Sequence, residues 1–166
     1  MRYHVLRLEV VDGARSAFPR AVNNLGIVVG YSSFGGLGRP TMWIGRRGFE
    51  TGTLGGRYGV AEDINDAGLI VGLGTTADDD YRAMSWSDEV GRGVVWFGKT
   101  SVQLDTLLDD DSQGLQIDGA EAITDRGQIV AQRSVDQVTI EPLLLTPRPG
   151  ATADRWHAAE TGDWRC

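Results

Sequence analysis

The sequence predicts an all-β fold made of three repeated four-stranded units that are arranged like the blades of a propeller. A strand–turn–strand motif occurs three times along the chain, and a second hairpin that contains a tryptophan occurs twice. The 166 residues include 23 glycines and only 5 prolines, a composition typical of turn-rich β structure. An internal repeat is stronger guidance to a fold than local propensity, so the repeat decides the fold class.

The repeated motif occupies residues 21–30, 61–72 and 122–131. Asn23, Asn65 and Thr124 occupy equivalent positions, and each side chain can accept a hydrogen bond from the backbone two residues on, which favours a type I turn. A glycine follows three residues later, where the chain needs a left-handed residue to enter the next strand. These glycines are Gly26, Gly68 and Gly127. The aliphatic residues that come next predict a strand buried on both faces.

The sequence also predicts the strands and hairpins that lie between the copies of this motif. Residues 3–10 alternate apolar and polar, which predicts a strand with one buried face. A second hairpin is expected over residues 41–54, and it recurs over 94–107, with Trp43 matched by Trp96 and Leu54 by Leu107 at one common offset. We expect both tryptophans in the core. An insert at about 77–90 separates the two hairpins of the second unit, and residues 142–147 replace the tryptophan strand in the third.

The third unit lacks a fourth strand, and the N-terminal strand 3–10 is predicted to supply it, since this pairing removes two exposed sheet edges. The repeats then cover about 17–54, 59–107 and 117–147 within a single domain, 1–150, followed by a tail, 151–166. Propellers typically have four to eight blades. Three arrangements therefore stay open: a small closed ring, a six-bladed ring shared by two chains, or a β-trefoil or β-prism.

The motifs resemble the bacterial HAF repeats, known as probable extracellular repeats. Residues 61–72 match the Ala-Ile-Asn-Asp-x-Gly-aliphatic-Gly half of that pattern, and residues 51–56 match its Leu-Gly-Thr-Leu-Gly-Gly half. Residues 143–147 resemble the usual end of such proteins. The resemblance covers about residues 3–147 and implies a propeller-like repeat fold, with no catalytic residues to transfer. Pro40-Thr41-Met42 stands where the family's His-Ala-Phe would be.

Composition narrows the classes of partner. The net charge of −7 argues against nucleic-acid binding. The single cysteine, Cys166, excludes an intrachain disulfide and a cysteine-clustered metal site. The sequence contains no apolar run long enough to span a membrane, and its start lacks a signal-peptide core. We therefore expect a cytoplasmic protein without a membrane partner, although members of the resembled family are often exported.

Equivalent positions of a rotational repeat come together around the axis. Just before the first hairpin, one aligned position holds Arg20, Glu62 and Glu121, and Asp63 stands where the other copies have alanine. Two carboxylates and a guanidinium near the axis suit a cationic or polar ligand, or acid–base chemistry if crowding raises the pKa of one glutamate. The alternative interpretation is an ion-pair cluster that neutralises itself. Trp86, in the insert, is a candidate aromatic platform for a sugar or peptide.

The other motifs give weaker evidence of a functional site. The Asp109–Gly114 loop resembles a calcium loop only in part, and a solvated acidic loop fits it better. Two histidines are too few for a histidine metal site. We expect neither a metal nor a cofactor. The first functional hypothesis is a non-catalytic module that binds a small molecule, sugar or peptide at a mouth on the repeat axis, with a homodimer as one possible assembly. The alternative is a small biosynthetic hydrolase, lyase or cyclase that uses Glu62, Glu121, Asp63 and Arg20.

Overall fold

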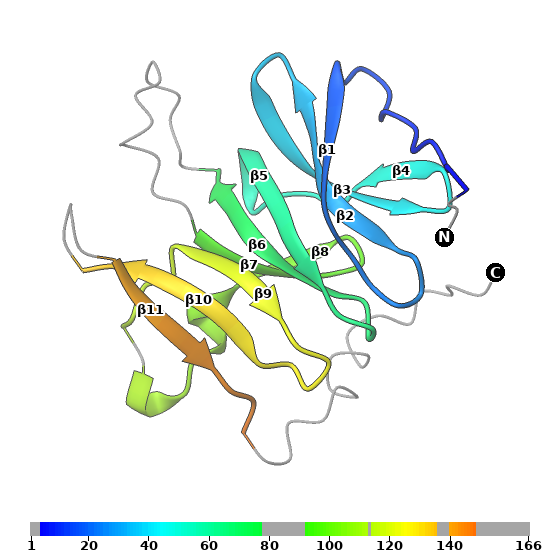
Figure 1. The fold of residues 1–166 in the computed structure, drawn as a ribbon. Helices are drawn as coiled ribbons and strands as arrows, with labels where there is room; N and C mark the ends of the chain where they lie inside the picture. The colour runs from blue at the N-terminus through cyan, green and yellow to red at the C-terminus, as the bar shows by residue number, and fades with distance from the viewer. Residues whose placement is uncertain (1–3, 78–91, 113, 136–139, 149–166) are drawn as a thin grey trace.

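The structure of the chain is a computed structural model that describes residues 4–77, 92–112, 114–135 and 140–148. The all-β prediction is confirmed, since the described residues form eleven β-strands and two short 3-10 turns, with no α-helix. Figure 1 shows the strands gathered into three antiparallel sheets that follow one another along the chain.

Each sheet is a meander of consecutive strands, as the repeat predicted. Sheet 1 contains β1 (Ser16–Val22), β2 (Val28–Phe34), β3 (Leu37–Ile44) and β4 (Arg47–Glu50) in that order. Sheet 2 contains β5 (Gly55–Ile64), β6 (Leu69–Thr76), β7 (Arg92–Phe97) and β8 (Thr100–Gln103). The 3-10 turns η1 (Leu104–Leu107) and η2 (Asp110–Ser112) lead to sheet 3, which contains β9 (Gly119–Ile123), β10 (Ile129–Ser134) and β11 (Ile140–Leu145).

The three sheets form an open arc with sheet 2 in the middle. Strand β5 contacts both β1 and β9, whereas the described strands of sheets 1 and 3 make no extensive contact with each other. We call the side of a sheet that is turned toward the next sheet its trailing face, and the opposite side its leading face. One core lies between the trailing face of sheet 1 and the leading face of sheet 2, and a second lies between sheets 2 and 3.

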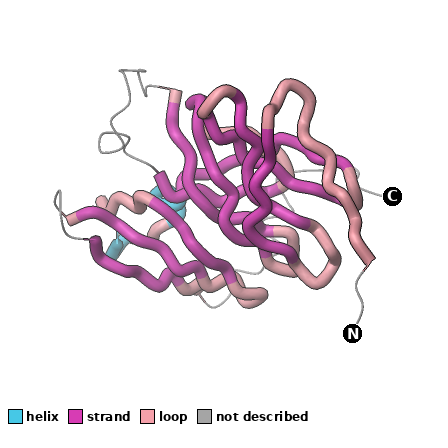
Figure 2. Tube along the Cα trace, turned by 45° about the horizontal axis from the view of Figure 1, so that its top comes forward, coloured by secondary structure: helices cyan, strands magenta, loops and turns pink. Residues whose placement is uncertain are grey.

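The predicted closure by the N-terminal strand is wrong within one chain. Residues 4–10 form no strand, and the Glu9 N–H donates to the carbonyl oxygen of Arg46 in sheet 1, at 2.8 Å. Figure 2 shows this segment running as a loop beside the first sheet. The physical reason is that three sheets do not complete a ring. The N-terminal segment lies beside sheet 1, and it therefore does not reach the edge strand β11 of sheet 3 in the same chain.

The left-handed glycines predicted for the three repeated turns are confirmed. Gly26, Gly68 and Gly127 have φ values of 76°, 82° and 77°, in the left-handed region that favours glycine. The Asn23 side-chain oxygen accepts from the N–H groups of Leu25 and Ile27. The backbone groups of each turn also pair, because the N–H of each turn glycine donates to the carbonyl of the Asn or Thr three residues earlier. Each hairpin therefore forms from its own local sequence.

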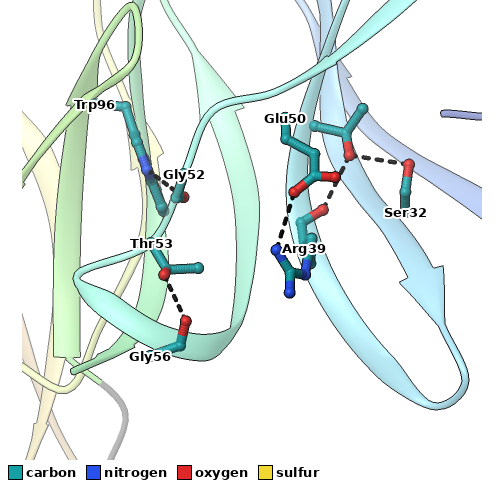
Figure 3. Close-up of polar contacts among 8 residues, drawn as sticks. Ser32, Arg39, Glu50, Gly52, Thr53, Gly56 and Trp96 are labelled. Carbon is teal, nitrogen blue, oxygen red and sulfur yellow. Dashed lines mark hydrogen bonds and ion pairs between the residues drawn. The ribbon is translucent and has the colours of Figure 1, made fainter. Parts of the chain in front are cut away.

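Both predicted core tryptophans are fully buried. The Trp96 indole N–H donates to the Gly52 carbonyl at 3.1 Å, and the Trp43 indole N–H donates to the Glu9 carbonyl at 2.8 Å. Figure 3 shows Trp96 held against the linker 51–54, where the Thr53 hydroxyl also donates to the carbonyl of Gly56 at the start of β5. Each tryptophan thus fixes the segment that enters its own sheet.

Candidate functional site

A β-bulge occurs at the same place in the first strand of every sheet. The pairing registers slip between Pro19 and Ala21, between Ala61 and Asp63, and at the equivalent point of β9. The extra residue at each slip is the one that the aligned sequence position had singled out: Arg20, Glu62 or Glu121. Bulges re-aim a side chain out of the regular alternation of a strand, and they are frequent next to functional sites.

The bulges explain two glycines in the neighbouring strands. A Cβ atom added to Gly30 would lie 2.1 Å from the carbonyl oxygen of Phe18, and one added to Gly72 would lie 2.1 Å from that of Val60. The bulged backbone therefore passes directly over these positions. Sheet 3 has Ala131 in the equivalent position, so its bulge has a different local fit.

The structure brings the bulged side chains of adjacent sheets together. The Arg20 Nε lies 3.6 Å from the Glu62 Oε2, with these side chains 47% and 21% exposed. Burial raises the pKa of Glu62, the guanidinium of Arg20 opposes that rise, and the nearby charge of Glu121 adds to it. Glu62 therefore stands between a cation in sheet 1 and an anion in sheet 3, and desolvation outweighs its ion pair.

An aromatic pair adjoins this cluster and was not predicted as part of the site. Phe18 stacks on Tyr31 with ring centroids 4.8 Å apart, and the Arg20 guanidinium carbon lies 5.6 Å from the Tyr31 ring centroid. Phe18 remains 43% exposed. Phe18 lies two residues before Arg20 in β1, and no motif in the sequence marked it as part of the site. Trp86, which was predicted to provide an aromatic platform, lies outside the described residues.

Asp63 connects sheets rather than facing the cluster. Its Oδ2 accepts a hydrogen bond from the Ile123 N–H of sheet 3 at 2.8 Å. The other repeats have alanine at this position, so only the junction between sheets 2 and 3 contains the bond. The aspartate that replaces the repeat's alanine in sheet 2 therefore has a structural role, which is to bond sheet 2 to sheet 3.

The repeated turns also bond to one another across the sheets. The Asn23 amide donates to the Asn65 carbonyl, and the Asn65 amide donates to the Thr124 carbonyl, both at 3.1 Å. Beside them, the Asn24 N–H donates to Asp66 Oδ1 and the Asp66 N–H donates to Asp125 Oδ1, both at 2.9 Å. We call this series the turn ladder. The side-chain and backbone hydrogen bonds from Asn24 hold the pKa of Asp66 below its ordinary value.

A cavity of about 630 Å³ opens between sheets 2 and 3. Apolar side chains such as Leu69, Leu104 and Ile129 form much of its wall, and polar groups that include Asp109 and Arg148 contribute to its lining. None of the bulged residues lines it, so it is separate from the charged cluster. We regard the charged cluster as the better candidate site, because the cavity wall continues the core between the two sheets.

The Asp109 loop next to this cavity is an ion-pair site. Arg148 Nη2 lies 2.7 Å from Asp109 Oδ2 and 3.6 Å from Asp111 Oδ2. A hydrogen bond from Ser112 and the Arg148 guanidinium lower the pKa of Asp109. Within the described ranges, no three His, Cys, Asp or Glu side chains come together as metal ligands would. No helix in the same ranges is long and apolar enough to cross a membrane.

Comparison with known proteins identifies no relative from which a function could be inferred. No family model, no curated protein and no solved structure matches this chain. The likeness to HAF repeats therefore remains a prediction from the motifs, and the function has to be inferred from the site itself.

Proposed function

We propose that this protein is a non-catalytic binding module whose site is the cluster of Arg20, Glu62 and Glu121 on the bulges, with the Phe18–Tyr31 pair as an adjoining flat wall. The observation that carries the proposal is the bulge itself. It recurs at one position in three sheets and each time directs a charged side chain out of the strand.

The charges define the ligand class. Two carboxylates and one guanidinium leave the cluster with a net charge of −1 when both glutamates are ionised. A ligand with one cationic group, such as an amino sugar or the lysine side chain of a peptide, would neutralise the cluster. It would also relieve the repulsion between Glu62 and Glu121. The exposed face of Phe18 suits the apolar part of such a ligand.

The first test compares cationic probes with neutral ones. We expect glucosamine and an N-terminally acetylated, lysine-containing tripeptide amide to shift the amide NMR signals of Glu62 and Glu121, whereas N-acetylglucosamine and the same blocked peptide with acetyl-lysine leave them unchanged. Glu62→Gln and Glu121→Gln should each weaken binding at least about tenfold, since each removes a charged partner. Glu141→Gln is the matched control, because Glu141 pairs with Arg133 outside the cluster. Equal binding by all three variants would reject the site.

A second prediction concerns pH. The folded state raises the pKa of Glu62, so it binds this proton more tightly than the unfolded chain does. The stability associated with the proton is complete below the unfolded pKa and is lost as pH rises through the folded pKa. Wild-type protein should therefore lose stability relative to Glu62→Gln as the pH rises above about 4, the ordinary pKa range of a glutamate side chain. The change in Tm difference should stay below about 3 °C, because the side chain is partly solvated. Thermal melts of both proteins across this range measure it, and a difference that moves in the opposite direction contradicts the assigned shift.

One observation favours the alternative of a small enzyme. A glutamate with a raised pKa, placed beside a second carboxylate and a guanidinium, has the properties of a general acid. The two functions differ in what Glu62→Gln does to a bound ligand. In a binding module the variant loses affinity, whereas in an enzyme it retains substrate and fails to convert it, which mass spectrometry of the recovered ligand distinguishes.

A further inference from the structure

We propose that two copies of this chain complete one ring of six sheets. In this ring the trailing face of sheet 3 packs on the leading face of sheet 1 of the second copy. Residues 4–7 of each copy form the fourth strand of the other copy's sheet 3. Two arcs joined in this way make two identical interfaces and leave no open end. The inference concerns assembly and does not depend on the proposed ligand.

The first argument is the apolar surface of sheet 3. Val29 and Val71 occupy the equivalent trailing-face position of sheets 1 and 2 and are fully buried against the next sheet, whereas Val130 of sheet 3 is 45% exposed. Leu144 is 63% exposed, although its counterpart Val95 in sheet 2 is only 2% exposed. Ile140 also belongs to this face. Sheet 3 therefore presents to solvent the same kind of face that the other two sheets bury.

The second argument is the place of the N-terminal segment. The Trp43 indole bonds to the Glu9 carbonyl as the Trp96 indole bonds to the Gly52 carbonyl, so Glu9 and Gly52 are equivalent. Two residues before Gly52, the chain leaves β4, the fourth strand of the preceding sheet. The residues before Glu9 accordingly lie where a preceding sheet would find its fourth strand. Residues 4–8 form no strand in this structure, and Leu6 is 53% exposed.

The equivalence also fixes the pairing register. In sheet 1 Met42 pairs with Phe49, and in sheet 2 Val95 pairs with Val102, both with apolar side chains on the trailing face. Carrying the same register to sheet 3 places Leu6 of one copy opposite Leu144 of the other. This pair is apolar as well, and strand β11 has no other described neighbour on that edge. An unpaired edge of this kind is a template for a strand from a second chain.

The third argument is polar complementarity between the two ends of the arc. The turn ladder runs from the Asn24 N–H to Asp66 and from the Asp66 N–H to Asp125, so the next donor in the series is the Asp125 N–H. The side-chain oxygen of Asn24 in a second copy stands at the matching acceptor position. The same juxtaposition places Glu121 beside Arg20 of the second copy, as Glu62 lies beside Arg20 within the chain. A second copy supplies the apolar face, the strand, the acceptor and the opposite charge together.

Solution mass provides the first test. Light scattering of the whole chain should give twice its mass of 18.0 kDa. Leu144→Arg should weaken the dimer at least about thirtyfold and yield folded monomer with an unchanged circular dichroism spectrum. Ile44→Arg is the matched control, since Ile44 is 46% exposed in sheet 1 but lies on neither end of the arc. A monomeric wild-type chain overturns the proposal, as does a dimer unaffected by Leu144→Arg.

A crosslink tests the exchanged strand and its register. In a Cys166→Ser background, mixed Leu6→Cys and Leu144→Cys chains should oxidise to a disulfide-linked pair, because directly opposed strand residues have the Cα separation that a disulfide needs. Mixing Leu6→Cys with Ile140→Cys should give no such product, since Ile140 lies four residues away along β11. In a chain that carries both Leu6→Cys and Leu144→Cys, a disulfide that forms only within that one chain means that the chain closes on itself, and this overturns the exchange. Absence of any crosslink does the same.

Discussion

Replacing Trp96 with alanine is expected to lower the free energy of unfolding by about 3–5 kcal/mol, the largest single effect that the structure supports. The side chain is fully buried in the core between sheets 1 and 2, where it belongs to one cluster with Val29 and Ile70. Truncation leaves a cavity that rigid sheets on both sides cannot fill. It also removes the donor to the Gly52 carbonyl.

Trp96→Phe separates these two contributions. Phenylalanine retains most of the buried aromatic surface but cannot donate to the Gly52 carbonyl, so we expect a smaller loss of about 1–2 kcal/mol. Urea unfolding followed by circular dichroism measures both variants. Hydrogen exchange at Val29 should accelerate in the alanine variant, because that residue belongs to the same inter-sheet cluster. A loss below about 1.5 kcal/mol for Trp96→Ala would show that the two sheets do not depend on this contact.

The features that could be predicted from the sequence are those that local chemistry decides. The spacing from Asn65 to Gly68 specifies a turn within four residues, and the structure has that turn with the glycine in the left-handed region. The matching offsets of Trp43 and Trp96 likewise placed both residues in the third strand of their sheets. The aligned position of Arg20, Glu62 and Glu121 identified the charged cluster, because a repeat superimposes equivalent residues.

The features that were missed depend on more than one sheet. The bulges were not predicted, because an extra residue in a strand changes the register with its neighbour and leaves no mark in its own composition. The turn ladder was missed for a related reason, since the second role of Asn65 involves a carbonyl in another repeat. Closure of the ring by residues 3–10 was predicted wrongly within one chain. The angle between successive sheets decides closure, and no residue pattern along the chain records that angle.

The turn ladder makes its own strong prediction at Asn65. This side chain is 3% exposed, its oxygen accepts from the Leu69 N–H at 2.9 Å, and its amide donates to the Thr124 carbonyl at 3.1 Å. Asn65→Ala removes both bonds, so the Leu69 N–H loses this side-chain acceptor and the Thr124 carbonyl keeps only its bond from the Gly127 N–H. We expect a loss of about 2–4 kcal/mol in the free energy of unfolding, measured by urea titration.

The chain itself offers the matched control for this variant. Thr124 occupies the equivalent position in sheet 3, where its hydroxyl oxygen accepts from the Gln128 N–H at 3.1 Å. Asn65→Thr should therefore retain the turn bond and lose only the bond to sheet 3, with a cost of about 1–2 kcal/mol. If Asn65→Thr proves as damaging as Asn65→Ala, the bond to sheet 3 alone accounts for the effect. If Asn65→Thr costs nothing, the bond between sheets contributes no stability. Only an intermediate result means that one asparagine both closes its own hairpin and fastens the next sheet to it.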